Sequence, residues 1–345
     1  MKALQVTRNA RPSEALRIVE IERPEPGPGQ VRVRVSAASL NFNDIDRCRG
    51  RVTTVPMPPP FVLGMDVCGV VDAAGAGGEA WVGKRVVAVT LMARGGLAEY
   101  ALAPLDSVFD APPELDDCEA AAFVIPYHTA HLALFERAAL REGESLLVHA
   151  GASGLGTAAI QLGRSCGARV FATAGGPHKT GLCTQLGAEL SIDHTALDFA
   201  QVVLDRTRDV GADVVCDLVG GRFVEPSWRC IARGGRYLAV GFADDAANGT
   251  TGRALRPACT GNFSIVGVMA AYMSQVPSAI RRMGLNPFGR DVGERTHREL
   301  MRLVARGEIK PVIGRRIALE EAAAALEDHE QRRTSGRSVV DLSAR

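Results

Sequence analysis

The middle of the chain, from about residue 145 to residue 270, repeats one pattern of hydrophobic and polar positions. Short runs rich in β-branched residues alternate with turns and with stretches of helical periodicity. The runs predict strands at residues 145–150, 168–174, 188–193, 212–219, 235–242 and 263–270. Because strands that alternate with helices form parallel sheets, this segment is predicted to be an α/β Rossmann domain with a doubly wound, six-stranded parallel sheet.

The first 120 residues follow a different pattern. The stretch QVRVRVSA, residues 30–37, places valines on one face of a strand and arginines on the other. Two more strand-like runs, at residues 61–71 and 83–90, lie among turns rich in glycine and proline. The pattern therefore predicts an irregular, mostly β domain.

The last part of the chain predicts helices around residues 294–307 and 319–330, followed by a strand at residues 337–342. This part holds too little apolar material to fold alone, so we expect it to pack on the N-terminal domain. The predicted domains are 1–120 with 271–345 for the mostly β domain, and 121–270 for the Rossmann domain.

Composition and charge narrow the possible functions. The chain has 345 residues, 46% of them hydrophobic, and a formal net charge of +1, which provides no basic surface for nucleic acid. No apolar run approaches the ~18 residues of a membrane helix, and the N-terminal segment has charges where a signal peptide has its apolar core. We therefore expect a cytoplasmic protein without a membrane partner. The eight cysteines are scattered, without the spacing of a zinc knuckle or a redox pair.

A glycine-rich turn follows the first predicted strand of the Rossmann domain. In LLVHAGASGLGTAAIQLG, residues 146–163, Gly151, Gly154 and Gly156 stand between an apolar strand and a helix. Such glycines let the backbone approach a pyrophosphate, which binds at the N-terminus of the following helix. Ser153 takes the place of the second glycine of the usual motif. Its hydroxyl either donates to a phosphate oxygen or serves the local structure.

The end of the second predicted strand bears on the choice of nucleotide. Proteins that bind NAD usually present an acidic residue there to the ribose hydroxyls, and this chain reads ATAGGPHK without an acid. Lys179 ends that stretch and is one of only four lysines beside 36 arginines. We therefore predict NADPH as the cofactor, with Lys179 meeting the 2′-phosphate. The alternative for Lys179 is a solvated charge on a helix.

The motifs, taken in order, resemble the medium-chain dehydrogenase/reductase family, and within it the zinc-free NADPH:quinone oxidoreductases that include zeta-crystallin. The resemblance covers nearly the whole chain and rests on SLNFNDIDRCRG, FVLGMDVCGVV, GKRVVAV, GGLAEYALAP, HAGASGLGTAAIQLG, ARVFATAGGPHK, DLVGG, GGRYLAVGF and KPVIGRRIALEEAAAAL. It implies a GroES-like catalytic domain made from both chain ends, a Rossmann domain between them, a cleft joining the two domains, and a homodimer.

The resemblance also bears on metal binding. Zinc-dependent members of the family carry a Gly-His-Glu motif and a cysteine ligand. This chain has Met65 and Asp66 where the histidine and glutamate stand, and LNFND at the position of the cysteine. A catalytic zinc needs three protein ligands, so we expect no metal. His128 and His131 are spaced i, i+3, but two histidines without a third ligand do not make such a site.

By resemblance, the cofactor and active-site residues are assigned position by position. Asn41 corresponds to an asparagine on the nicotinamide side of the cleft, and Thr129 to a threonine that contacts the nicotinamide. Arg332 corresponds to a residue that closes over the 2′-phosphate, although the neighbouring Arg333 leaves this register open. The other implied cofactor contacts are Ala150, Gly151, Ser153, Gly154, Leu155, Gly156, Thr173, Lys179, His194, Val219, Gly220, Gly241 and Phe242.

Three candidate residues have structural alternatives. Asn41 can instead cap a helix that starts at NDID, and His194 can be an exposed loop residue. Tyr127 is the nearest aromatic candidate for the substrate pocket, and packing in the core is its alternative.

The implied reaction is hydride transfer from NADPH to an electron-poor conjugated acceptor, for which the protein supplies orientation and a dry cleft. A quinone is the leading small-molecule acceptor. The activated C=C bond of an enone, enal or enoyl thioester is the alternative. The proton comes from solvent or from a hydroxyl such as that of Tyr127. A nucleotide-binding structural protein without turnover is a further alternative. The run FSIVGVMAAY predicts either an edge strand that pairs across a dimer or an interior strand.

Overall fold

The computed structural model of the protein describes residues 1–51, 57–244 and 253–343. The chain folds into two compact units. Unit 1 consists of Met1–His128 together with Ala270–Arg345, and unit 2 consists of Thr129–Met269. None of the helices in the described ranges combines the length and the hydropathy that crossing a membrane requires.

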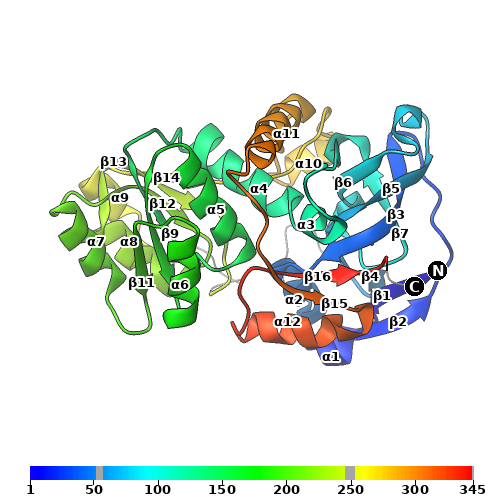
Figure 1. Cartoon of the computed structure of the whole chain (residues 1–345), viewed down its shortest axis with the longest axis horizontal. Helices are drawn as coiled ribbons and strands as arrows, with labels where there is room; N and C mark the ends of the chain where they lie inside the picture. The colour runs from blue at the N-terminus through cyan, green and yellow to red at the C-terminus, as the bar shows by residue number, and fades with distance from the viewer. Residues whose placement is uncertain (52–56, 245–252, 344–345) are drawn as a thin grey trace. The chain divides into compact units, whose positions relative to one another are not determined.

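Unit 2 contains a parallel sheet with the strand order β11-β10-β9-β12-β13-β14 (Figure 1). Its strands are β9 (Ser145–Val148), β10 (Arg169–Ala174), β11 (Leu190–Asp193), β12 (Ala212–Asp217), β13 (Ile231–Ala239) and β14 (Ser264–Gly267). The six predicted strands are confirmed, and an order with the first strand in the middle is that of a doubly wound Rossmann sheet. In the sheet as described, β14 is an edge strand, so the interior alternative for FSIVGVMAAY is wrong.

Helices follow the strands of unit 2 and pack against the sheet (Figure 1). They are α5 (Gly154–Ser165), α6 (Pro177–Gln185), α7 (Phe199–Thr207), the short 3-10 helix η5 (Gly221–Phe223), α8 (Val224–Arg229) and α9 (Arg256–Gly261). The strand residues Leu147, Phe171 and Val215 are completely buried in one cluster with Val203 of α7 and Val224 of α8. Helix α4 (Val124–His131) begins in unit 1 and, within unit 2, continues into a π-helical turn, η4 (Leu132–Arg137).

Unit 1 contains two sheets, one with the order β2-β1-β4 and one with the order β15-β16-β3-β5-β6-β8, in which β7 also pairs with β3. The strands are β1 (Lys2–Val6), β2 (Leu16–Glu20), β3 (Gln30–Ser39), β4 (Phe61–Val62), β5 (Asp66–Ala74), β6 (Arg85–Val89), β7 (Tyr100–Pro104), β8 (Val108–Asp110), β15 (Ile313–Ile317) and β16 (Arg337–Asp341). The C-terminal strand β16 pairs with β3, with Val340 opposite Ala38. Backbone hydrogen bonds therefore join the tail to the N-terminal sheet.

Unit 1 also contains helices. They are α1 (Pro12–Ala15), α2 (Phe42–Arg49), α3 (Asp117–Ala121), α10 (Ser278–Arg282), α11 (Arg290–Ala305) and α12 (Ala322–Glu330), with short 3-10 helices η1 (Glu79–Trp81), η2 (Leu91–Ala93), η3 (Leu105–Ser107) and η6 (Leu319–Glu321). The core includes Val33 of β3, Ile45 of α2 and Leu326 of α12, each completely buried.

The two arginines of β3 do not share one environment. Arg34 is exposed, as the alternating pattern predicts. Arg32 is only 5% exposed, because its guanidinium group pairs with Asp72 at 2.9 Å and with Glu25 at 2.7 Å. Acidic partners on neighbouring segments thus permit an arginine to be buried on the polar face.

His149 directly follows β9 and lies completely buried in unit 2. Its Nδ1 atom is 2.9 Å from the hydroxyl of Thr173, and its Nε2 atom is 2.7 Å from the hydroxyl of Ser227. The Ser227 hydroxyl donates its only proton to the Phe223 carbonyl at 2.6 Å. Ser227 therefore accepts from Nε2–H, and Nδ1 accepts from Thr173. Burial lowers the pKa of His149 to about 4, so the imidazole is neutral at pH 7.

Because His149 is neutral in the folded protein, we predict that its contribution to the free energy of unfolding is lost in acid. The pKa of this residue is 6.5 when exposed and about 4 in the fold, so between these values protons bind mainly to the unfolded chain. The contribution of His149 is complete above pH 6.5 and is lost as the pH falls toward 4, at a rate of up to about 1.4 kcal/mol per pH unit. In this window, we expect the free energy of unfolding to fall less steeply in His149→Gln than in the wild-type protein.

The matched control is His178→Gln, because His178 is exposed. Burial raises the pKa of Asp44 to about 6, and a raised carboxyl pKa changes stability with the opposite sign between pH 3.8 and 6. Since Asp44 is present in all three proteins, the comparison between them isolates His149. The free energy of unfolding is measured by denaturant titration at several pH values. If it changes with pH equally in the wild-type protein and in His149→Gln, the buried neutral imidazole is contradicted.

Candidate functional site

The glycine-rich turn between β9 and α5 brings backbone segments too close together for side chains. A Cβ atom on Gly156 would lie 2.2 Å from the carbonyl oxygen of Ala150, and a Cβ atom on Gly151 would lie 2.8 Å from Sγ of Cys183. Ala150 adopts a left-handed conformation with a φ of 50°. The amide of Gly151 donates to the carbonyl of Thr173 at 2.8 Å, which ties the turn to β10. The turn therefore requires glycine at two of its three predicted positions.

The turn leads directly into the N-terminus of α5, a helix of 12 residues. Ser153 is the N-cap residue, and its hydroxyl oxygen accepts from the amide of Gly156 at 3.0 Å. The structural alternative for Ser153 is thus present, and its hydroxyl proton is not used in that bond. The amides of Gly154 and Leu155 belong to the first turn, where backbone donors have no intrahelical acceptor. This arrangement fits the pyrophosphate of a dinucleotide.

The carboxyl end of β10 adjoins this turn. Thr173 is completely buried, and its side chain bonds to His149 while its carbonyl accepts from Gly151. Thr173 therefore holds the glycine-rich turn in place through both its backbone and its side chain. Beyond β10, Gly176 precedes α6 with a φ of 81°, and Lys179 lies half-buried in the first helical turn. No acidic residue stands between the end of β10 and Lys179.

His194 follows β11 and lines a small pocket of about 100 Å³ in unit 2 together with Phe199, Arg222 and Phe223. The ring of His194 meets Phe223 edge-on, with 5.0 Å between centroids. A Cβ atom at Gly175, just past β10, would lie 3.6 Å from Nε2 of His194. His194 is therefore packed against its neighbours and is not an exposed loop histidine. Arg222 directly follows DLVGG and was not among the predicted residues.

Four predicted residues stand beyond β12 and β13, namely Val219, Gly220, Gly241 and Phe242. Asp217, completely buried and missed from the sequence, fixes the first pair, because its Oδ1 accepts from the amides of Val219 at 2.8 Å and Gly220 at 2.9 Å. Its other oxygen accepts from the hydroxyl of Tyr237, whose pKa is raised by burial. A Cβ atom on Gly241 would lie 2.3 Å from the Leu218 carbonyl oxygen. An acid at the end of an apolar strand was the available signal for Asp217.

Asn41 is the N-cap residue of α2 in unit 1. Its backbone amide donates to the carboxylate of Asp44 at 2.8 Å, which stabilises the start of the helix. Its side chain turns to other partners, because Nδ2 donates to Asp66 at 2.8 Å and Oδ1 accepts from Arg337 at 3.0 Å. The residue is 5% exposed. The backbone of Asn41 therefore takes part in capping α2, as the structural alternative predicts. The side-chain amide of Asn41 instead belongs to a buried group of hydrogen-bonded polar side chains.

The remaining predicted residues lie in different surroundings. Tyr127 is 1% exposed and stacks on Phe123 with 5.2 Å between ring centroids, so it packs in the core of unit 1. Thr129 is half-buried and is the first residue of unit 2. Arg332 is exposed and has a φ of 57°. Its neighbour Arg333 forms a salt bridge of 2.7 Å with an aspartate of α12.

The residues considered for metal binding have other partners. Both ring nitrogens of His128 are engaged, with the hydroxyl of Tyr272 at 2.9 Å and with His297 at 3.1 Å. His131 instead packs against a phenylalanine ring of the next helical turn, and burial lowers its pKa to about 4. In the part of the chain that the structure describes, no three histidine, cysteine or acidic residues cluster as a metal site.

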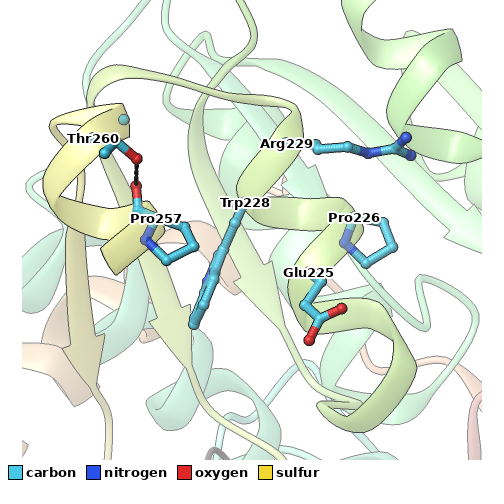
Figure 2. A pocket seen from close by; sticks show the side chains of 7 residues that line it. Glu225, Pro226, Trp228, Arg229, Pro257 and Thr260 are labelled. Atoms are coloured by element: carbon cyan, nitrogen blue, oxygen red, sulfur yellow. Dashed lines mark hydrogen bonds between the residues drawn. The ribbon is translucent and has the colours of Figure 1, made fainter. Parts of the chain in front are cut away.

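A wider groove of about 640 Å³ lies on unit 2 beside α8 and α9 (Figure 2). Its lining residues are Glu225, Pro226, Trp228, Arg229, Pro257, Thr260 and Gly261. None of them is a predicted site residue. Two of its polar side chains already have partners, since Thr260 donates to the Pro257 carbonyl at 3.3 Å and Arg229 pairs with Asp198 at 2.8 Å. The strand ends, where the glycine-rich turn meets α5, therefore form the better candidate site.

Two family models match the chain. The alcohol dehydrogenase GroES-like domain matches residues 27–113, and the zinc-binding dehydrogenase matches residues 154–284. The quinone oxidoreductase of Rattus norvegicus is 31% identical over 270 residues, which cover 78% of this chain and 76% of that relative.

Solved structures show the same similarity over the full length. A mycobacterial protein complexed with NADPH has a TM-score of 0.85 and 28% identity, and the match covers 99% of both chains. The quinone oxidoreductase of Thermus thermophilus, also solved in complex with NADPH, has a TM-score of 0.77 and 32% identity, over 99% of this chain and 100% of that one. Together with the glycine-rich turn, the parallel sheet and the mostly β unit, these similarities show that the chain belongs to the quinone oxidoreductase, zeta-crystallin-like group of the medium-chain dehydrogenase/reductase family.

Proposed function

We propose that the protein is an NADPH-dependent oxidoreductase that transfers a hydride to a quinone. The observation that carries the proposal is the backbone cradle at the N-terminus of α5, beside a strand end that has Lys179 and no acid. A carboxylate there would repel a 2′-phosphate, and an ammonium group attracts it. The NADPH complexes of the mycobacterial and Thermus structures and the name of the rat relative support the same conclusion.

Each part of the cofactor has a matching group of residues in this proposal. The glycine-rich turn from Ala150 to Gly156 binds the pyrophosphate, and Lys179, His194 and Arg332 bind the 2′-phosphate. Thr173 positions the turn. The strand-end residues Val219, Gly220, Gly241 and Phe242 line the cofactor, and Asn41 and Thr129 contact its nicotinamide end. NADPH, when bound, supplies the hydride.

The acceptor and the proton complete the proposed reaction. A quinone accommodates the incoming negative charge on its own carbonyl oxygens, so the protein needs to orient the acceptor and to exclude water from it. Tyr127 is the candidate proton donor from the sequence, but it is 1% exposed and stacks on Phe123. Solvent is therefore the proposed source of the proton.

A homodimer in the cytoplasm is also part of the proposal. The edge strand β14 carries Ile265, which is 36% exposed, and Met269 just beyond it is 38% exposed. An exposed apolar strand edge is suited to pairing with the same edge of a second copy. All eight cysteines are free thiols, which is typical of proteins in a reducing compartment.

Replacing Lys179 by alanine tests the choice of nucleotide. The ammonium group is expected to form a charge-assisted hydrogen bond with the 2′-phosphate, which NADH lacks. We expect Lys179→Ala to weaken NADPH binding by about 1.5–3 kcal/mol, roughly 10- to 150-fold in Kd, and to leave NADH binding nearly unchanged. Fluorescence titration or calorimetry with both nucleotides measures the difference.

Lys84→Ala is the matched control, because Lys84 lies over the ring of Trp81 in unit 1. This variant is expected to bind NADPH like the wild-type protein. An equal loss of NADPH and NADH affinity in Lys179→Ala would refute the assignment of Lys179 to the 2′-phosphate.

Steady-state oxidation of NADPH tests the acceptor. We expect faster turnover with an ortho-quinone than with an alkyl vinyl ketone, and little turnover with NADH in place of NADPH. The quinone carries two carbonyl groups that spread the developing charge, whereas the enone carries one. A clear preference for the enone would assign the protein to reduction of activated C=C bonds. Tight NADPH binding without turnover of either acceptor would support a nucleotide-binding structural protein.

A further inference from the structure

Four buried side chains of unit 1 form one continuous group of hydrogen bonds, here named the Asn41 clamp. They are Ser39 at the end of β3, Asn41 before α2, Asp66 at the start of β5 and Arg337 at the start of β16. Ser39 and Asp66 are completely buried, and Asn41 and Arg337 are 5% and 9% exposed. Asp66 and Arg337 are 271 positions apart in the chain and form an ion pair at 3.2 Å.

The partners of Asn41 fix the orientation of its amide group. The carboxylate of Asp66 can only accept, so the atom 2.8 Å from its Oδ1 is the Asn41 nitrogen. The guanidinium group of Arg337 can only donate, so the atom 3.0 Å from its Nη2 is the Asn41 oxygen. A flipped amide would place donor against donor and acceptor against acceptor. The clamp therefore allows one orientation of Asn41.

This orientation determines what Asn41 can offer to a ligand. Its nitrogen has two hydrogens, and their acceptors are Asp66 at 2.8 Å and the backbone carbonyl of Ser39 at 3.3 Å. Its oxygen has two lone pairs, and Arg337 occupies one of them. The unused capacity of the side chain is one lone pair on Oδ1. A ligand that contacts Asn41 must donate a hydrogen bond to it.

The charges in the clamp depend on each other. Burial raises the pKa of Asp66, and Arg337 and the hydrogen bonds from Ser39 and Asn41 oppose that shift. Ser39 also accepts from Arg337 while it donates to Asp66. Removal of either charge would leave the other one buried without a counter-ion, which is strongly unfavourable. The ion pair therefore has to stay intact for Asn41 to keep its orientation.

We propose that Asp66 and Arg337 are positioning residues that hold Asn41 as a hydrogen-bond acceptor for NADPH. This inference rests on the proposed function, which places Asn41 at the nicotinamide end of the cofactor. That end carries two kinds of donor, the N–H groups of the carboxamide and the hydroxyls of the ribose. Asn41 receives a hydrogen bond from one of these groups and gives none.

A reciprocal exchange of residues tests the proposal. Asn41→Asp places a carboxylate against Asp66, so we expect a lower unfolding midpoint. Adding Asp66→Asn restores one carboxylate, one amide and the ion pair with Arg337, so the double variant is expected to recover at least half of the loss. The exchanged pair again presents an acceptor oxygen at position 41, and the donor has moved to position 66. We therefore expect its Kd for NADPH to stay within about threefold of the wild-type value.

Asn41→Leu gives the reference for a lost contact, because leucine has a similar size and neither donates nor accepts. We expect its Kd for NADPH to rise about tenfold, as for the loss of one hydrogen bond. If the exchanged pair is as stable as expected but binds NADPH as weakly as Asn41→Leu, then Asn41 acts as a donor and the proposal is overturned. If the double variant is no more stable than Asn41→Asp, the proposed clamp is overturned.

The ion pair of Arg32 with Asp72 is the matched control, since it joins a second buried arginine to a half-buried acid in the same sheet. Asp72→Asn is expected to lower the unfolding midpoint without changing NADPH binding. The stability measurements need no cofactor, so they test the clamp even if the wild-type protein fails to bind NADPH, a result that would overturn the proposed function. An unchanged Kd in Asn41→Leu would overturn the contact between Asn41 and the cofactor.

Discussion

Polar groups that are buried at the strand ends must find partners inside the protein, and the candidate site depends on how they do so. An unpaired buried donor or acceptor costs about 1–3 kcal/mol, a large share of a folding free energy of about 5–15 kcal/mol. His149 meets this requirement by joining Thr173 of β10 to Ser227 of α8. Asp217 meets it by accepting from two loop amides and from Tyr237. The same hydrogen bonds that satisfy buried groups therefore fix the loops that we assign to the cofactor.

The buried polar groups of the chain are satisfied both by neutral partners and by ion pairs. In unit 2, His149 contacts the neutral hydroxyls of Thr173 and Ser227, and the carboxylate of Asp217 accepts from the amides of one loop. In unit 1, arginines pair with buried or half-buried acids, as Arg337 does with Asp66. The planar guanidinium group holds five N–H donors in a fixed arrangement, whereas the lysine ammonium group has three donors and no planar fork. Unit 2 contains such a pair as well, between the half-buried Arg236 and Glu144 at 2.7 Å. Arginine is thus used for internal ion pairs in both units, which makes the lysine at position 179 stand out in a chain with 36 arginines.

The sequence predicts those features of the fold that depend on local patterns. The six strands of unit 2 follow from runs of β-branched residues, and the glycine-rich turn follows from steric demands within a few residues. The directions of individual side chains depend on partners far away in the chain. The family resemblance assigns Thr173 to the cofactor, yet its hydroxyl contacts His149, 24 positions earlier. Asn41 contacts Arg337, 296 positions later, and no periodicity encodes such a pair.

The position of Asp66 also limits the chemistry of the proposed reaction. Zinc-dependent members of the family carry a glutamate at this position, and the carboxylate of Asp66 accepts from Ser39, Asn41 and Arg337. Its neighbour Met65 replaces a histidine with a thioether, which is a poor ligand for zinc. A substrate that needs a Lewis acid to polarise its oxygen is therefore poorly served by these residues. A quinone needs none, because hydride transfer reduces it to a hydroquinone anion, a phenolate whose charge is delocalised by its own aromatic ring. A thioether and a carboxylate held in an ion pair thus stand where zinc-dependent members have metal ligands. These residues favour an acceptor that can take up a hydride without a Lewis acid.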